Sequence, residues 1–186
     1  MQLVCKSMYS FYRKQGLLAI EPCAEDLFGP TYYCFRLGGV MSAGKVVAVK
    51  NEVPISPREG LHVFSRERFV LSKRVFGLLG ASSELILGGL HLKHSPFIDP
   101  GFAGSLELVI ENWTASDLTL KPEMILGKVT FFDVSDTMLE LHEHALSERT
   151  KEKWQARDEA WRNIQDAIIE ARVNSEAPNP NPIRWS

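Results

Sequence analysis

Short strand-like runs of residues follow one another through most of the chain between residue 31 and about residue 134, and in the clearest of them apolar and polar residues alternate with a period of two. The clearest run is 104–111, in which Leu106, Leu108 and Ile110 share one face and the residues between them share the other. Gly, Pro, Asn and Ser separate this run from others like it, at 32–37, 46–49, 61–65, 69–71, 118–120 and 128–134. Many short strands between such breakers predict a mostly β fold, a distorted jelly roll or barrel.

The pattern becomes helical near the N-terminus. Residues 7–18 predict a short amphipathic helix with Ser7 as its N-cap and Gly16 at its end. The segments 74–79 and 82–87 fit either a helical or an extended structure.

The pattern is helical again beyond residue 136. No Gly or Pro occurs from 137 to 176, and charged residues are dense there. Large apolar residues recur at spacings of seven, three, four and three, which is typical of a helix; they are Trp154, Trp161, Ile164, Ile168 and Ala171. This stripe packs either on its own barrel or, through the helix 138–173, on another subunit or a partner. The sequence thus predicts a barrel domain (1–136), a long C-terminal helix (137–176) and an extended tail (177–186).

Composition narrows the classes of protein. Hydrophobic residues make up 45% of the 186 residues and charged residues 24%, so the chain has enough apolar material for a core. The net charge of −2 does not favour a nucleic-acid polymer as partner, although a local cluster of donors would still suit a small anion. No apolar run approaches ~18 residues, so a membrane span is not expected. The N-terminus does not resemble a signal peptide, so a cytoplasmic location is expected.

The three cysteines are Cys5, Cys23 and Cys34, and none forms a Cys-x-x-Cys pair. Their number and spacing argue against a disulfide framework and against a thiolate zinc site. His91 and His94 flank Lys93, but a spacing of three on an extended segment turns side chains to opposite faces. A metal pair is therefore not expected there, and Lys93 and His94 could instead supply positive charge to a ligand near Asp99.

An Asp-Pro-Gly turn precedes the clearest strand, in the order Ile98-Asp99-Pro100-Gly101-Phe102-Ala103-Gly104. The turn sets the carboxylate of Asp99 at the mouth of the strand, where a ligand could use it. Three further pieces accompany it in the chain: Arg36-Leu37-Gly38, Gly80-Ala81-Ser82-Ser83 and Leu120-Lys121-Pro122-Glu123-Met124-Ile125-Leu126-Gly127. Together these pieces resemble motifs of the dCTP deaminase/dUTPase family over roughly residues 7–134.

The resemblance implies a trimer of β-barrels with active sites at the subunit interfaces, acting on deoxynucleoside triphosphates. In the deaminase branch a Glu activates water without zinc, and the water attacks C4 of cytosine. The Ser-Ser segment and its Arg handle the phosphates. The Asp of the turn contacts the deoxyribose in deaminases and activates the attacking water in dUTPases.

Four residues match positions that bind the nucleotide in this family. Ser82 and Ser83 stand at the phosphate-binding serines, Asp99 at the deoxyribose contact and Phe102 at the aromatic beside the base. Each has a structural alternative: an ordinary polar turn for the serines, an Asx-type turn for Asp99 and core packing for Phe102.

Three positions depart from the family. Ala81 and Ile86 stand where the family has arginines, and Val109 stands where the deaminase has its catalytic Glu. A Val cannot transfer protons. Glu107 and Glu111 share its face, but each lies about 6.6 Å along the strand, further than direct proton transfer allows. With Asp99 they are the candidate substitutes.

The sequence therefore predicts a nucleotide-binding, deaminase-like protein with weak or no deaminase activity, assembled as a homotrimer. No intrinsic cofactor is expected, and Mg²⁺ would arrive with a bound nucleotide triphosphate. Two alternatives stay open: an active deaminase or pyrophosphatase with a rearranged site, and a structural protein that uses the barrel as a trimeric scaffold.

Overall fold

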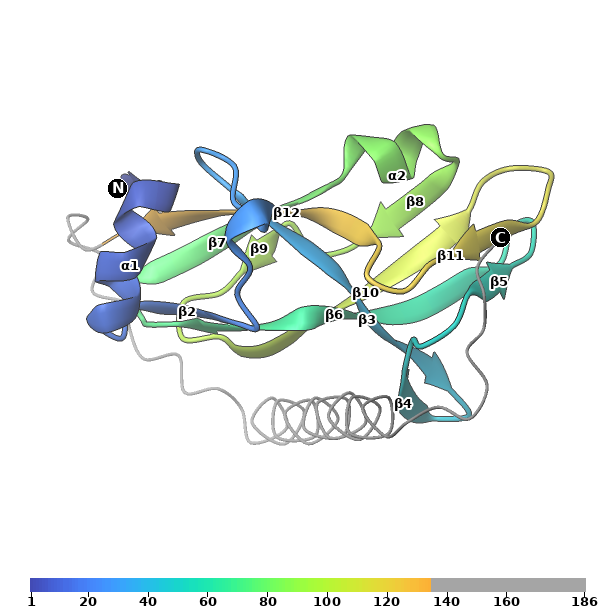
Figure 1. The fold of residues 1–186 in the computed structure, drawn as a ribbon, viewed down its shortest axis with the longest axis horizontal. Coiled ribbons are helices and arrows are strands. Elements are labelled where there is room, and N and C mark those ends of the chain that lie inside the picture. Colours follow the sequence, from blue (N-terminus) through green and yellow to red (C-terminus); the bar gives the residue numbers. More distant parts are fainter. Residues whose placement is uncertain (135–186) are drawn as a thin grey trace, which may run out of the picture.

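The computed structural model describes residues 1–134 of the chain, which form a mostly β structure with two short α-helices (Figure 1). The helices are α1 (Lys6–Lys14) and α2 (Ser83–Leu87), and a 3-10 turn covers Glu25–Leu27. The strands are β1 (Gln2–Val4), β2 (Leu18–Glu21), β3 (Tyr33–Ser42), β4 (Lys45–Ala48), β5 (Val53–Ile55), β6 (Gly60–Leu71), β7 (Val75–Ala81), β8 (Leu90–Lys93), β9 (Phe97–Ile98), β10 (Ala103–Asn112), β11 (Leu118–Leu120) and β12 (Ile125–Asp133).

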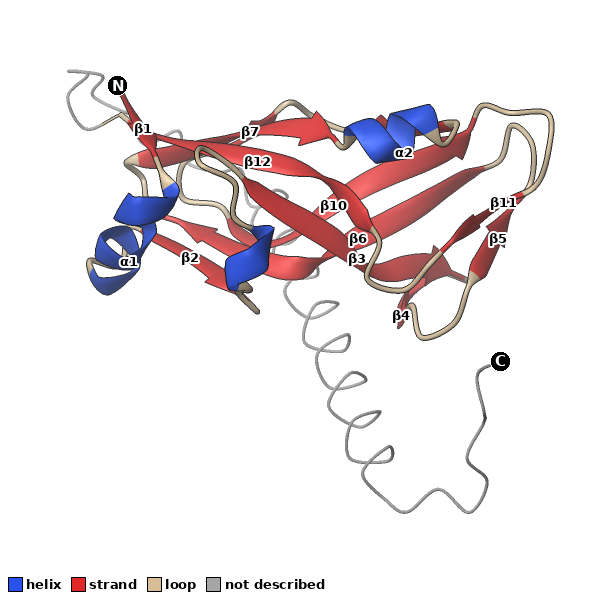
Figure 2. Ribbon diagram, turned by 45° about the horizontal axis from the view of Figure 1, so that its top comes forward, coloured by secondary structure: helices blue, strands red, loops and turns tan. Residues whose placement is uncertain are grey.

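Ten of these strands form one antiparallel sheet, and seven of the ten follow the order β8-β10-β6-β3-β12-β7-β9. The other three pair beside this path: β1 with β12, β2 with β6 and β4 with β3. The long strand β6 pairs with β10 along one edge, and along the other it pairs first with β3 and then with β2. This splitting curls the sheet into a half-barrel, so the predicted mostly β fold is confirmed. Figure 2 shows α1 at one end of the molecule and the separate β5–β11 pair at the other.

Bulges line up across neighbouring strands of this sheet. The register shifts in each of three adjacent pairs: between Ser105 and Glu107 where β10 meets β6, between Leu37 and Gly39 where β3 meets β6, and between Ile125 and Gly127 where β12 meets β3. A bulge bends its strand and increases the local twist. A row of bulges therefore bends the whole sheet across its width, which favours the curl.

Aromatic side chains fill the inside of the curl. Tyr33, Phe35 and Phe69 are fully buried. The rings of Tyr33 and Phe69 meet edge to face at 6.4 Å between centroids, and Phe69 lies 6.1 Å from Phe131. Leu106, Leu108 and Ile110 are buried as the alternation predicted, whereas Ser105, predicted on the outer face, is buried beside the register shift between β10 and β6.

Helix α1 is confirmed but is shorter than predicted. Its N-cap is Cys5, without a side-chain hydrogen bond, and Ser7 lies inside the helix, so Ser7 is not the cap. Gly16 has a φ of +67° just after the helix, a conformation that glycine adopts without strain. Tyr12 anchors the helix, because its hydroxyl donates to Asp133 Oδ2 at 2.8 Å.

The predicted C-terminal helix 137–176, with its Trp154 and Trp161 stripe, and the tail 177–186 lie outside the described residues. Neither helix within residues 1–134 is long and apolar enough to cross a bilayer.

Candidate functional site

The Asp-Pro-Gly turn is closed by its own backbone. The amide of Phe102 donates to the carbonyl of Asp99 at 3.1 Å, and that of Gly101 donates to the carbonyl of Ser72 at 3.1 Å. Gly101 has a φ of +81°, in the left-handed region that favours glycine. The turn therefore holds the exposed Asp99 between the end of β9 and the start of β10.

A cleft of about 180 Å³ opens beside this turn. Three residues singled out from the sequence line it together: Asp99, Phe102 and Glu107. Phe102 also belongs to the main core, where it is 8% exposed, so it packs in the core and borders the cleft at once. His94 lines the cleft too, with its Nδ1 2.8 Å from the carbonyl oxygen of Ser95.

The edge of β10 explains how Glu107 reaches this cleft. Strand β8 pairs with β10 only over Val109–Asn112, and the preceding residues Leu106, Glu107 and Leu108 line the cleft although they are consecutive. The buried hydroxyl of Ser65 replaces the missing ladder partner: it accepts from the amide of Leu106 at 2.8 Å and donates to the carbonyl of Glu67 at 2.6 Å. Ser65 is thus a supporting residue that the alternation pattern did not reveal.

Val109 lies on the outer face of the sheet between two titratable neighbours. Its cross-strand partners are Lys93 on β8 and His62 on β6. Both Glu candidates beside it are engaged by these strands: Glu107 Oε1 lies 3.7 Å from His62 Nδ1, and Glu111 pairs with Lys93.

Glu111 is held outside the cleft. Its carboxylate pairs with Lys93 and accepts a hydrogen bond from Trp113 Nε1 at 2.9 Å. The hydrogen bond from Lys93 and then that from Trp113 lower the pKa of Glu111 below its usual value. Glu111 is absent from the cleft lining, so of the candidate substitutes only Asp99 and Glu107 meet there.

The two serines do not line the cleft. Ser82 is 4% exposed and caps α2: its Oγ accepts from the amide of Leu85 at 3.1 Å and lies 3.5 Å from the carbonyl of Ile125, to which it donates. Its hydroxyl is therefore occupied by the fold. Ser83 is exposed at the first position of α2.

Ala81 and Ile86 stand at positions that carry arginines in the resembled family, and both are apolar. Ala81 pairs with Gly127 at the end of β7. Ile86 projects from α2 with 53% of its surface exposed, and Leu87 beside it is 87% exposed. Glu84 is the charged residue of this segment.

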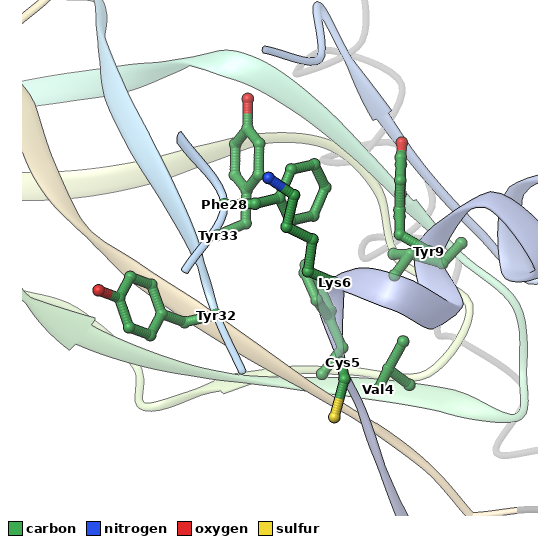
Figure 3. A pocket seen from close by; sticks show the side chains of 9 residues that line it. Val4, Cys5, Lys6, Tyr9, Phe28, Tyr32 and Tyr33 are labelled. Carbon is green, nitrogen blue, oxygen red and sulfur yellow. The ribbon is translucent and has the colours of Figure 1, made fainter. Parts of the chain in front are cut away.

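Two other hollows lie in the part of the chain that the structure describes. Figure 3 shows the first, a crevice beside α1 where Lys6 reaches over Phe28, its Nζ 5.8 Å from the ring centroid. Its volume of about 10 Å³ is the room that one water needs, so it does not suit a nucleotide. The second is an open hollow of about 510 Å³ beside β4, lined mainly by valines and by none of the predicted site residues.

An ionic cluster lies at the bend of the sheet and was not found from the sequence. The carboxylate of Glu67, fully buried, accepts from Arg36 through the backbone amide at 2.8 Å and through Nε at 2.7 Å. Glu123 bridges Arg36, at 2.9 Å, and Arg66. The only signal in the sequence is that Glu123 replaces the Gly of the Leu-x-Pro-Gly turn, at a residue whose φ is +62°.

Comparison with known proteins shows which family has this curled antiparallel sheet and Asp-Pro-Gly turn. Residues 43–134 match the family model described as dCTP deaminase-like. The dCTP deaminase of Pyrococcus horikoshii is 30% identical over 122 residues, which cover 64% of this chain and 78% of that relative. The dCTP deaminase of Thermococcus kodakarensis is 33% identical over 107 residues, covering 56% of this chain and 68% of the relative. The chain therefore belongs to the dCTP deaminase-like family.

A solved structure shares the fold. The 2'-deoxycytidine 5'-triphosphate deaminase of Agrobacterium tumefaciens superposes with a TM-score of 0.58 at 14% identity, over 70% of this chain and 48% of that chain. At this identity the likeness concerns the fold alone.

Proposed function

We propose that the protein binds a (deoxy)nucleotide, with the base and deoxyribose in the Asp99 cleft, and that it has weak or no deaminase activity. The observation that carries the proposal is the cleft itself, in which Asp99, Phe102 and Glu107 meet. A carboxylate accepts hydrogen bonds from sugar hydroxyls, and an aromatic wall suits the face of a base. The two archaeal relatives named above are dCTP deaminases, which supports a ligand of this kind.

The loss of deamination follows from proton chemistry. Attack of water on C4 of cytosine needs a base that takes a proton from the water within hydrogen-bond reach. Val109 occupies the position of the family's catalytic Glu, and its side chain has no titratable group. Glu111 is occupied by Lys93 and Trp113 outside the cleft, so it is poorly placed to replace that Glu.

One observation favours a second candidate, an active enzyme with a rearranged site. Asp99 and Glu107 share the cleft, and two carboxylates at one site can divide the roles of acid and base. In that case Glu107, next to His62, would take the place of the missing Glu, and Mg²⁺ would accompany a bound triphosphate.

The proposal includes a homotrimer. The segment of Ser82 and Ser83 does not line the cleft of its own chain, and the resemblance implies sites shared between subunits. A scaffold without a ligand is the third function, and the same experiment separates it from the others.

The test uses the full chain, a panel of pyrimidine and purine nucleosides and nucleotides, and two readouts, thermal unfolding and ammonia release from dCTP. A ligand at 100 times its Kd stabilises the folded state by about 2.7 kcal/mol. We expect one class of ligand to raise the Tm, Asp99→Ala to remove most of that rise, and no release of ammonia. Asp117→Ala, at an exposed acid in the β10–β11 loop, is the matched control.

Three other outcomes have definite meanings. Rapid release of ammonia that is lost in Glu107→Gln would establish the rearranged enzyme. Release of ammonia that survives Asp99→Asn and Glu107→Gln together would exclude both carboxylates as catalytic groups. A Tm that no ligand of the panel changes would favour the third function, a scaffold without a ligand.

A further inference from the structure

The outside of the sheet is apolar where β1, β12, β7 and β9 pair with one another. Side chains along these strands alternate between the core and the outside, so the residues next to the buried Val75, Val129 and Phe131 point away from the core. Large apolar residues take most of these outward positions. We call them the outer apolar face: Leu3, Phe76, Leu78, Phe97 and Phe132.

The register of the strands brings these side chains together. Phe132 lies opposite Phe76 on β7 and opposite Leu3 on β1, and Leu78 lies opposite Phe97 on β9. The rings of Phe76 and Phe132 stack, with 5.2 Å between their centroids and 15° between their planes. The five residues therefore form one patch that crosses four strands.

The two described helices leave this patch open to solvent. Phe97 is 57% exposed, and the other four side chains are half-buried. Helix α1 packs on the opposite side of the sheet, because Tyr12 donates to the inward-facing Asp133, and α2 begins only after β7 has ended. A contiguous apolar patch on a surface marks a place where another segment or another protein packs.

The chain leaves β12 at the edge of the patch. The described residues end at Val134, two positions after Phe132. The amide of Val134 donates to the carbonyl of Arg74 at 2.8 Å, and Arg74 stands two positions before Phe76. Figure 2 shows β1, β7 and β12 together at the end of the molecule where α1 lies. The segment that follows residue 134 therefore starts beside the two stacked rings.

The sequence of that segment suits the patch. Ser135 and Asp136 leave a connection of two residues, a common length between a strand and a helix that packs on its sheet. Thr137 and Glu140 have the spacing of a capping box, which agrees with the helix predicted to start at 137. Helical spacing puts Glu140 and Glu143 on one face and apolar residues on the other; the apolar residues are Met138, Leu139, Leu141, Ala145 and Leu146.

The sizes of the two surfaces agree. Four neighbouring strands extend over about 14 Å from the first axis to the last. A helix over residues 138–146 is about 13 Å long and, with its side chains, about 10 Å wide. The apolar side of these first turns therefore covers most of the outer apolar face.

We propose that residues 137–149 dock as an amphipathic helix on the outer apolar face of their own chain. The occupant is this segment rather than a second copy, because the segment starts beside the face and closing so short a connection costs little chain entropy. The docked helix removes the stacked rings of Phe76 and Phe132 from water and adds a second layer to the sheet.

The experiment is site-directed cross-linking in the full chain, after Ser has replaced the three native cysteines. Leu78→Cys on the patch is combined with Leu141→Cys on the segment, and a short bismaleimide is added. We expect a bridge within one chain, identified by mass spectrometry of the digested protein. Val47→Cys on β4, also at an exposed apolar residue, replaces Leu78→Cys in the control and should give no bridge.

A second control separates a docked helix from a segment that is merely nearby. Glu140→Cys stands one residue before Leu141 but on the polar side of the helix, so it should bridge to Leu78→Cys about ten times more slowly than Leu141→Cys does, because a helix turns adjacent side chains to different faces. Equal rates at 140 and 141 would overturn the proposal. Bridges formed only between chains would also overturn it, since a second copy would then cover the patch.

Trypsin cleavage after Arg149 measures the same contact without cysteines. Cleavage requires the segment to open, so Leu78→Glu and Leu141→Glu should each speed it by at least about tenfold, whereas Val47→Glu should leave it at the parent rate. Thermal unfolding shows whether Leu78→Glu folds, and Leu141→Glu, beyond the described strands, decides the test if it does not. Cleavage of Leu141→Glu at the parent rate would overturn the docking.

Discussion

The side chain of Glu67 places a carboxylate in the interior of the protein, at the bend of the sheet. It is fully buried, and its carboxylate takes the place of a ladder acceptor for Arg36. Burial raises the pKa of Glu67 above its usual value, although the hydrogen bonds and charge of Arg36 work in the opposite direction. The folded protein therefore holds this proton more tightly than the unfolded chain does.

This difference predicts how the stability depends on pH. A raised pKa in the folded state contributes stability that is fully present below the unfolded pKa, near 4.3, and is lost as the pH rises through the folded value. We expect the free energy of unfolding of the parent, minus that of Glu67→Gln, to fall between about pH 4 and neutrality. Urea titrations at each pH measure it, with Glu52→Gln at an exposed site as the control. A difference that grows with pH would mean that Arg36 outweighs burial.

Glu123 combines backbone strain with ion pairing in a single residue. Its φ of +62° is disfavoured for a residue with a side chain, at a cost of about 1 kcal/mol. Its carboxylate bridges Arg36 and Arg66, but the side chain is 45% exposed, so solvent screens these pairs. The backbone strain therefore lowers the stability of the fold and the ion pairs raise it, by similar amounts.

Two substitutions separate these effects. Glu123→Gln keeps the strain and removes the charge, so it should destabilise the fold by about 0.5–1 kcal/mol. Glu123→Gly removes both, and relief of strain should return the stability to within about 0.5 kcal/mol of the parent. Urea unfolding compares the three proteins. A glycine variant less stable than the glutamine variant would show that the strain is negligible.

Helix α2 depends on the first of two adjacent serines. Ser82 is buried and caps the helix, whereas Ser83 is exposed within it. We expect Ser82→Ala to destabilise the protein by about 1 kcal/mol, the usual cost of losing an N-cap, and Ser83→Ala to stay within about 0.5 kcal/mol of the parent. Thermal and urea unfolding decide between them, and equal effects would contradict the capping role.

The strands and their inward faces could be predicted from local pattern, but the connections between strands could not. Leu106, Leu108 and Ile110 alternate as a strand with one buried face should, and the structure buries them. The predicted strands 61–65 and 69–71 are one strand, β6, because the polar residues between them include Glu67, which pairs with Arg36 inside the fold. A pairing between residues 31 positions apart leaves no local trace.

The sequence indicated only the part of the candidate site that lies in one local segment. Asp99 and Phe102 belong to one turn, whose sequence is distinctive. Glu107 joins them because it lies in the part of β10 with which β8 does not pair. Ser82 caps α2 in the structure: a serine before a helix is a common N-cap as well as a possible phosphate ligand, and sequence cannot distinguish the two uses.

At the scale of the whole molecule, helix α2 exposes an apolar surface. Ile86 and Leu87 on α2 are exposed apolar side chains, and burying them against a second copy of the chain would stabilise an assembly. A contact between two different surfaces of the same chain is head-to-tail, and it closes into a ring when the rotation allows it. In the homotrimer proposed above, we expect α2 to be buried at each contact between copies.

This arrangement predicts the mass of the full chain and the effect of changing α2. We expect a species of about three times 21.0 kDa in native mass spectrometry and light scattering. Replacing both Ile86 and Leu87 by Glu should yield folded protein of one-chain mass, because burying two carboxylates at an apolar contact is unfavourable. Val47→Glu, at an equally exposed apolar residue on β4, should leave the mass unchanged. A trimer that survives the double substitution would move the interface away from α2, and a parent protein of one-chain mass would rule out the ring.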